Sequence, residues 1–267
     1  MTDSIHYVSL LQLTDSHILG KPDDTLLGID TAYYFNAVLE HAFTSQTHFD
    51  LCLLTGDLAQ DPCSASYCHL LDKLEDYNIP SVCLPGNHDD YGIMQAILNT
   101  ERINCRKQVF VGNWQIISLN SQIVDSPNGY LAQDELAFLE QCLKQRPDLF
   151  SLIAVHHHCI PSRTIWMDSM MISNAQELFD LIKKYPKATT VVNGHIHQEM
   201  DIQLDFVRVL TTPSTCFQFK PNSKSFSLDD KSPGYRWLNL YDDGSLHTGV
   251  VHIPEPLVGL EAATHGY

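Results

Sequence analysis

Apolar residues gather in short runs along the first 192 positions, and several of the segments between the runs place apolar residues at helical spacing. The runs are rich in Val, Ile and Leu, and largely continuous runs of this length are typical of strands buried on both faces. We therefore expect a series of buried strands in this part of the chain. The runs lie at residues 7–13, 49–54, 81–84, 114–119, 149–155 and 189–192.

Three of the intervening segments have one apolar face at the spacing of an α-helix. They include residues 33–42, 136–143 and 173–185. The third is expected to begin at Ser173 or Asn174, which are both good N-cap residues, and to carry two lysines in its last turn, where positive charge is favourable. Strands that alternate with helices predict an α/β fold.

The chain changes character past residue 199, where "DIQLDFVRVL", "RWLNLY" and "LHTGVVHI" have strand-like composition. The tetrapeptide "DDGS" at 242–245 is typical of a tight turn between two strands. No repeat, low-complexity tract or long linker interrupts the sequence. We expect a single domain of residues 1–267, in which residues 200–267 form a β-rich C-terminal part.

Most of the predicted strands end at residue types that bind metals or transfer protons. In an extended segment residues i and i+2 face the same side, so an i, i+2 pair can reach one ion. The C-terminal ends of strands in an α/β sheet converge on the ligand crevice. Each motif alone is also typical of a solvated turn, but five motifs in order, each at a strand end, indicate a site. The residues are Asp15 and His17 in "TDSH", Asp57 in "TGD", Asn87 and His88 in "GNHD", one of His156, His157 and His158, and His195 and His197 in "NGHIH".

This mixture of carboxylate, amide oxygen and imidazole suits first-row ions such as iron, manganese or zinc. It does not suit Ca²⁺, which prefers oxygen ligands alone. The chain has 16 Lys and Arg against 32 Asp and Glu, a formal net charge of −16, and so acidic a surface repels nucleic acid and anionic membranes. An anionic substrate would therefore need positive charge inside the site, which metal ions provide.

The eight cysteines form no C-x-x-C pair, and several lie in apolar runs where Cys acts as a small hydrophobic residue. Reduced thiols are therefore expected. The apolar stretch at 7–13 is too short for a signal peptide or a membrane span. These features predict a cytoplasmic protein with no membrane association.

The order D-x-H, G-D, G-N-H-D, H, G-H-x-H resembles the calcineurin-like metallophosphoesterase superfamily. The stretches "LLQLTDSH", "LLGIDT", "TGDLAQD", "PGNHD", "HHH", "NGHIHQE" and "TPSTCFQFKP" are similar to the bacterial class III 3′,5′-cyclic-AMP phosphodiesterases along nearly the whole chain. The resemblance implies a four-layer α/β/β/α sandwich with a dinuclear metal site at the C-terminal strand ends. It also implies hydrolysis of 3′,5′-cyclic AMP to 5′-AMP by a metal-activated hydroxide, which lowers intracellular cyclic AMP.

The resemblance further implies roles for individual residues. His88 would be catalytic, because an imidazole can donate a hydrogen bond or a proton to the substrate. The two metal ions are expected to be Fe²⁺ or Mn²⁺, with Zn²⁺ as an alternative. One ion would be bound by Asp15, His17 and His197 and the other by Asn87, His157 and His195, with Asp57 bridging both. The substrate would be contacted by His17, Asp57, Asn87, His88 and His197.

The histidine run departs from the family pattern. A proline usually stands two residues beyond the histidine ligand, and here Cys159 occupies that place. Counting back from Cys159 selects His157, with His156 and His158 as alternatives.

The segment after the bridging carboxylate also departs from some branches of the superfamily. Those branches place an Asp three residues later, where it orients the catalytic histidine. This chain has Gln60 at that position, so Asp61 is the candidate for orienting His88.

Two rival functions use the same residues. A broader phosphodiesterase would act on glycerophosphodiesters or 2′,3′-cyclic nucleotides, and nothing outside the resemblance identifies adenine. A non-catalytic scaffold of the same fold would have lost ligands, whereas all seven predicted ligand positions and His88 carry suitable side chains. A nuclease is disfavoured because an acidic surface does not offer the basic groove that tracks a polyanion.

Overall fold

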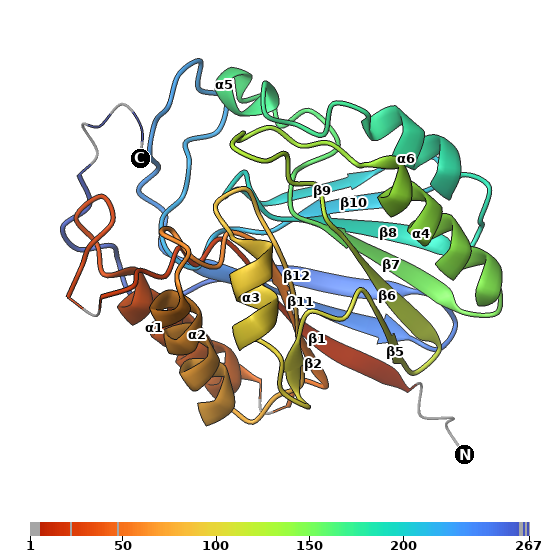
Figure 1. The fold of residues 1–267 in the computed structure, drawn as a ribbon, viewed down its shortest axis with the longest axis horizontal. Coiled ribbons are helices and arrows are strands. Elements are labelled where there is room, and N and C mark those ends of the chain that lie inside the picture. The colour runs from red at the N-terminus through yellow and green to blue at the C-terminus, as the bar shows by residue number, and fades with distance from the viewer. Residues whose placement is uncertain (1–5, 22, 47, 262–263, 265, 267) are drawn as a thin grey trace.

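Two six-stranded sheets face each other, and helices cover both outer faces, as Figure 1 shows. The structure is a computed structural model that describes residues 6–21, 23–46, 48–261, 264 and 266. This arrangement confirms the predicted α/β/β/α sandwich.

The first sheet has the order β12-β11-β1-β2-β3-β4. Its strands β1 to β4 run parallel, whereas β11 is antiparallel to β1 and β12 to β11. The C-terminal part of the chain therefore completes the sheet that the N-terminal part begins. The strands are β1 (Tyr7–Leu13), β2 (Leu51–Thr55), β3 (Ser81–Leu84), β4 (Ile103–Asn104), β11 (Gly234–Tyr241) and β12 (Leu246–His252).

The second sheet has the order β5-β6-β7-β8-β10-β9. The four central strands run parallel, and the two edge strands are antiparallel to their neighbours. The parallel strands of both sheets lead toward one common edge. The strands are β5 (Gln108–Val111), β6 (Trp114–Leu119), β7 (Phe150–Val155), β8 (Ala188–Asn193), β9 (Met200–Gln203) and β10 (Arg208–Thr211).

Three apolar clusters fill the spaces between the four layers. One packs α1, α2 and α3 against the first sheet, and another packs α4 and α6 against the second. The third lies between the sheets, where Leu10 and Leu53 from one side meet Ile116 and Leu152 from the other. The helices are α1 (Thr31–Ser45), α2 (Ser64–Asp76), α3 (Tyr91–Ile97), α4 (Gln133–Gln145), α5 (Ile165–Asp168) and α6 (Ala175–Ile182).

All six apolar runs form strands, and the "DDGS" turn joins β11 to β12. The third predicted helix is shorter than expected. α6 ends at Ile182, so Lys183 and Lys184 follow the helix and do not lie in its last turn. At the other end Asn174 occupies the N-cap position, but its side chain forms hydrogen bonds with the backbone of Leu131 and does not cap the helix. In the described part of the chain, no helix is both long enough and apolar enough to cross a membrane.

Candidate metal centre

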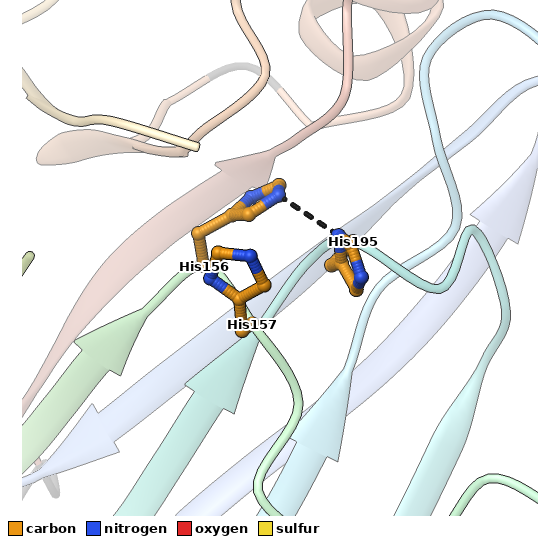
Figure 2. A group of neighbouring side chains, drawn as sticks. All are labelled: His156, His157 and His195. Carbon is orange, nitrogen blue, oxygen red and sulfur yellow. Dashed lines mark hydrogen bonds between the residues drawn. The ribbon is translucent and has the colours of Figure 1, made fainter. Parts of the chain in front are cut away.

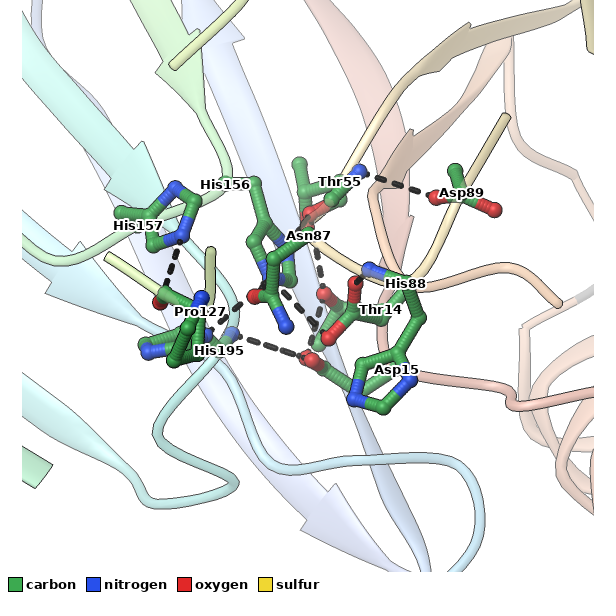
Figure 3. Close-up of polar contacts among 12 residues, drawn as sticks. Thr14, Asp15, Thr55, Asn87, His88, Asp89, Pro127, His156, His157 and His195 are labelled. Atoms are coloured by element: carbon green, nitrogen blue, oxygen red, sulfur yellow. Dashed lines mark hydrogen bonds and ion pairs between the residues drawn. The ribbon is translucent and has the colours of Figure 1, made fainter. Parts of the chain in front are cut away.

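The predicted ligands lie at the common edge of the two sheets, directly after five parallel strands. β1, β2 and β3 approach from the first sheet, and β7 and β8 approach from the second. Figure 3 shows Asp15, Asn87, His156 and His195 gathered around a common centre between the strand ends. The structure therefore brings together groups that are up to 182 positions apart in the sequence, from Asp15 to His197.

Backbone strain is concentrated at this edge. Of ten described non-glycine residues with positive φ, five are predicted ligands. Such conformations cost about 1–3 kcal/mol each and persist where the surrounding structure holds them, which is typical of functional sites. Sharp turns immediately after the strands direct these side chains into one centre. The five residues are Asp15 (53°), His17 (46°), Asp57 (50°), His195 (68°) and His197 (47°).

The first group consists of Asp15, His17 and His197, whose potential ligand atoms lie within 4.8 Å of one another. His197 Nε2 lies 3.4 Å from Asp15 Oδ1 and 3.4 Å from His17 Nε2. The pKa of His17 is lowered to about 3, mainly by burial and to a smaller extent by the charge of His88, so this imidazole is neutral at pH 7. Burial raises the pKa of Asp15, but the adjacent His197 outweighs it and holds that pKa below its ordinary value. A neutral imidazole beside an ionised carboxylate is the protonation state that metal binding requires.

The second group centres on His156. Its Nε2 lies 3.2 Å from Asp57 Oδ2 and 3.2 Å from Asn87 Oδ1. The same nitrogen lies 3.2 Å from His195 Nδ1. Burial lowers the pKa of His156, but the Asp57 carboxylate outweighs it and raises the pKa to about 9. His156 and Asp57 thus form an ion pair, and a metal ion bound here would replace the proton.

His157 belongs to the same histidine cluster, but both of its nitrogens have other partners. Figure 2 shows its imidazole beside those of His156 and His195. One potential ligand nitrogen from each of the three rings lies within 4.8 Å of the other two. His157 Nε2 donates to the Pro127 carbonyl at 3.2 Å, and the Ser121 hydroxyl donates to Nδ1 at 2.7 Å. His158 belongs to none of the candidate ligand groups that the described residues form, and its Nε2 lies 3.4 Å from Asp168 Oδ1. Among the three alternatives that the sequence leaves open, the geometry therefore favours His156.

Asp57 is shared between the two groups. Its Oδ1 accepts the backbone N–H of His88 at 2.8 Å, and its Oδ2 faces His156. It combines with His17 and His88 in one candidate set and with Asp15 and His156 in another. Burial raises the pKa of Asp57, but the imidazoles of His156 and His88 outweigh it and hold the pKa well below its ordinary value. A shared, ionised carboxylate is suited to bridging two cations.

The donor chemistry fits a pair of metal ions. His156 Nε2 lies 3.2 Å from a carboxylate oxygen, an amide oxygen and a second imidazole nitrogen, a set of converging donor atoms that suits a bound cation. Each group combines imidazole with carboxylate or amide oxygen, which is the ligand mixture of Fe, Mn and Zn sites.

Asp89 joins the Asp57 loop to the turn that carries Asn87 and His88. Its carboxylate is buried and accepts four different donors. The pKa of Asp89 is raised to about 6, mainly by burial and to a smaller extent by the charge of Asp57. The neighbouring Asp90 is instead the N-cap of α3. In the "NHDD" stretch, the first three residues therefore belong to the site or support it, and the fourth stabilises the helix that follows. The donors to Asp89 are the N–H groups of Leu58 (3.1 Å), Ala59 (3.1 Å) and Gly86 (2.9 Å) and the Tyr67 hydroxyl (3.0 Å).

Two supporting residues after β6 are not signalled by the sequence. Gln122 Nε2 donates to the carbonyls of Gly86 and Asp89, at 2.5 and 2.7 Å, and so holds both ends of that turn. Ser121 contacts His157, as described above. Neither residue stands in a recognisable motif, and only the fold brings the loop after β6 to the site.

The segment after Asp57 also differs from expectation. The side chain of Asp61, the candidate for orienting a histidine, is exposed. Gln60 instead reaches the cluster, where its Oε1 lies 2.8 Å from His17 Nδ1.

Comparisons with known proteins relate the chain to one family. Residues 8–199 match the family model described as calcineurin-like phosphoesterase. The 3′,5′-cyclic adenosine monophosphate phosphodiesterase CpdA of Escherichia coli (strain K12) is 40% identical over 261 residues, which cover 97% of this chain and 95% of that protein. The 3′,5′-cyclic-nucleotide phosphodiesterase alr5338 of a Nostoc species is 39% identical over 250 residues, covering 94% of each.

Solved structures agree with the fold. A dimetal phosphatase from Danio rerio superposes with a TM-score of 0.61 over 90% of this chain and 98% of that one. At 11% identity, this likeness concerns the fold alone.

Proposed function

Because the chain belongs to the calcineurin-like phosphoesterase family, we propose that it hydrolyses 3′,5′-cyclic AMP to 5′-AMP and so lowers the concentration of this messenger. Support comes from relatives named as cyclic-AMP phosphodiesterases, which match the chain over nearly its whole length. The observation that carries the proposal is the cluster in which His156 Nε2 lies 3.2 Å from each of three candidate ligand groups. A single domain of residues 1–267 belongs to the proposal, since β11 and β12 complete the sheet that contains β1.

Two metal ions per chain are part of the proposal, with Fe²⁺ or Mn²⁺ expected and Zn²⁺ as the alternative. His156 takes the role that the sequence assigned to His157. When bound, such a pair supplies electrophilic stabilisation of the phosphate and lowers the pKa of water toward neutrality. One ion would be held by Asp15, His17 and His197 and the other by Asn87, His156 and His195, with Asp57 shared.

His88 is proposed as the catalytic acid. Its backbone is anchored to Asp57 Oδ1, and its half-buried ring lies edge-on to that of His17 with centroids 5.0 Å apart. From this position the imidazole can donate a hydrogen bond to a phosphate oxygen or a proton to the departing 3′ oxygen. The substrate would be contacted by His17, Asp57, Asn87, His88 and His197.

The net charge of the chain supports a small-molecule substrate, and its unpaired cysteines support a cytoplasmic location. A net charge of −16 disfavours nucleic acid and anionic membrane as partners. All eight cysteines are unpaired, which is typical of a reducing compartment.

Metal-dependent turnover is the first measurement. Metal-stripped protein is supplied with Mn²⁺ or Fe²⁺ and assayed on 3′,5′-cyclic AMP, 2′,3′-cyclic AMP, a glycerophosphodiester and a generic diester. We expect efficient conversion of 3′,5′-cyclic AMP to 5′-AMP that requires metal. Asn87→Ala should lower kcat/KM by about 100- to 1,000-fold, a loss comparable to removing one preorganised charge-stabilising group.

The other outcomes separate the rival functions. If kcat/KM is higher for the 2′,3′-cyclic nucleotide or the glycerophosphodiester, the metal site stands and the cyclic-AMP assignment fails. If no diester is turned over with any metal, a non-catalytic scaffold is the better description.

Asp89→Asn is expected to lower kcat by about 10- to 100-fold, the range typical of groups that orient metal ligands. The substituted amide would place its NH₂ group against the backbone donors that now face a carboxylate. The measurement compares kcat and the melting temperature with those of Asp90→Asn, because asparagine is an equally good N-cap for α3. Equal effects of the two substitutions would contradict a positioning role for Asp89.

A further inference from the structure

Three imidazoles of the cluster are held through their second ring nitrogen by neutral oxygen atoms. His156 Nδ1 lies 2.8 Å from the Thr55 carbonyl, and His197 Nδ1 lies 2.7 Å from a backbone carbonyl of the segment after β10. His17 Nδ1 lies 2.8 Å from Gln60 Oε1. Of these three acceptors, only that of Gln60 belongs to a side chain. It is therefore the one that a substitution can remove without changing the backbone.

The local backbone delivers Gln60 to His17. Beyond β1 and β2 the two segments continue side by side, with His17 N–H donating to the Asp57 carbonyl at 3.0 Å. The Gln60 N–H in turn donates to the Ile18 carbonyl at 3.1 Å. One short segment therefore supplies both the shared carboxylate and, three residues later, the partner of His17.

The hydrogen bond selects a tautomer of His17. An amide oxygen only accepts, so a proton on Nδ1 is required and the lone pair then lies on Nε2. Nε2 is the nitrogen that faces the first group, 3.4 Å from His197 Nε2. The acceptor is also neutral, so it orients the ring without adding a third carboxylate to the two of Asp15 and Asp57.

We propose that Gln60 is a positioning residue for the first metal ion: its amide oxygen holds His17 in the tautomer and orientation in which Nε2 can ligate. The proposal rests on the assignment of His17 as a ligand in the proposed function. Partners of this kind typically change metal affinity by about 10- to 100-fold when they are removed.

Calorimetric titration of metal-stripped protein with Mn²⁺ alone tests the affinity. Gln60→Leu is expected to weaken one of two Mn²⁺ sites by about 10- to 100-fold and leave the other unchanged. Gln60→Glu keeps an acceptor oxygen and should restore that site to wild-type affinity or better. The matched control is Gln176→Leu, which makes the same substitution on the exposed face of α6 and should bind as the wild type does.

The second readout needs neither metal nor substrate. Long-range ¹H–¹⁵N spectra of metal-free protein report the tautomer of His17, whose signals are assigned by their loss in His17→Asn. We expect the Nδ1–H form in the wild type and in Gln60→Glu, and a mixture of tautomers in Gln60→Leu.

Wild-type tautomer and Mn²⁺ affinity in Gln60→Leu would overturn the proposal. If Gln60→Leu does not fold, loss of the Nδ1–H form or of Mn²⁺ affinity in the folded Gln60→Glu variant would overturn it equally. Failure of the proposed metal site is distinguishable, because then the wild type itself would bind no pair of ions while its His17 tautomer could still be read. A different preferred substrate would leave both the Mn²⁺ titration and the tautomer unchanged.

Discussion

Asp57→Asn is expected to lower kcat/KM for 3′,5′-cyclic AMP by about a thousandfold, the upper end of the loss typical of one preorganised charge-stabilising group. Asp57 is the carboxylate common to both candidate groups, and it also anchors the backbone of His88. Asparagine has the same shape but only one oxygen and no charge, so it cannot hold two cations together. The measurement combines steady-state kinetics with the content of bound metal, which should fall at both sites.

Asp180→Asn on the exposed face of α6 is the matched control, with expected wild-type activity and metal content. A loss of only about tenfold in Asp57→Asn, with two ions still bound, would contradict a bridging role.

The second large effect distinguishes two adjacent histidines. His156→Ala is expected to lower kcat/KM by about a thousandfold and to abolish binding of one Mn²⁺, because His156 Nε2 lies beside Asp57, Asn87 and His195. His157→Ala should instead lower the free energy of unfolding by about 2–4 kcal/mol, through the cavity it creates and the partners it leaves unpaired. It should retain two bound ions and kcat within about tenfold of wild type.

Metal titration, kinetics and urea unfolding of the two variants give the comparison. Loss of a metal ion in His157→Ala, with full metal content in His156→Ala, would reverse the assignment and favour the residue chosen from the sequence.

Much of the architecture is readable from the sequence because buried parallel strands have a strong local signature. The runs at 7–13 and 114–119 coincide with β1 and β6, since strands covered on both faces need continuous apolar residues. β4, with only two residues, and β5, with no buried residue, carry no such signature. Helices α2 and α3 also lie outside the predicted set.

The sequence by itself determined which chemical groups reach the common edge. Ligand-type residues follow directly after buried strands, and parallel strands bring their ends together whatever the order of the strands. The tertiary structure decided which nitrogen atoms face the centre. The three consecutive histidines after β7 have the same side chain, so the sequence alone does not distinguish them. The direction of the backbone after β7 does: His156 points toward Asp57, whereas His157 points toward Ser121. The partner of His17 was decided in the same way, because Gln60 reaches the ring only where the segments after β1 and β2 run side by side. Spacing along a chain limits which residues can meet, but the direction of a side chain depends on the backbone turns and neighbours that only the folded molecule supplies.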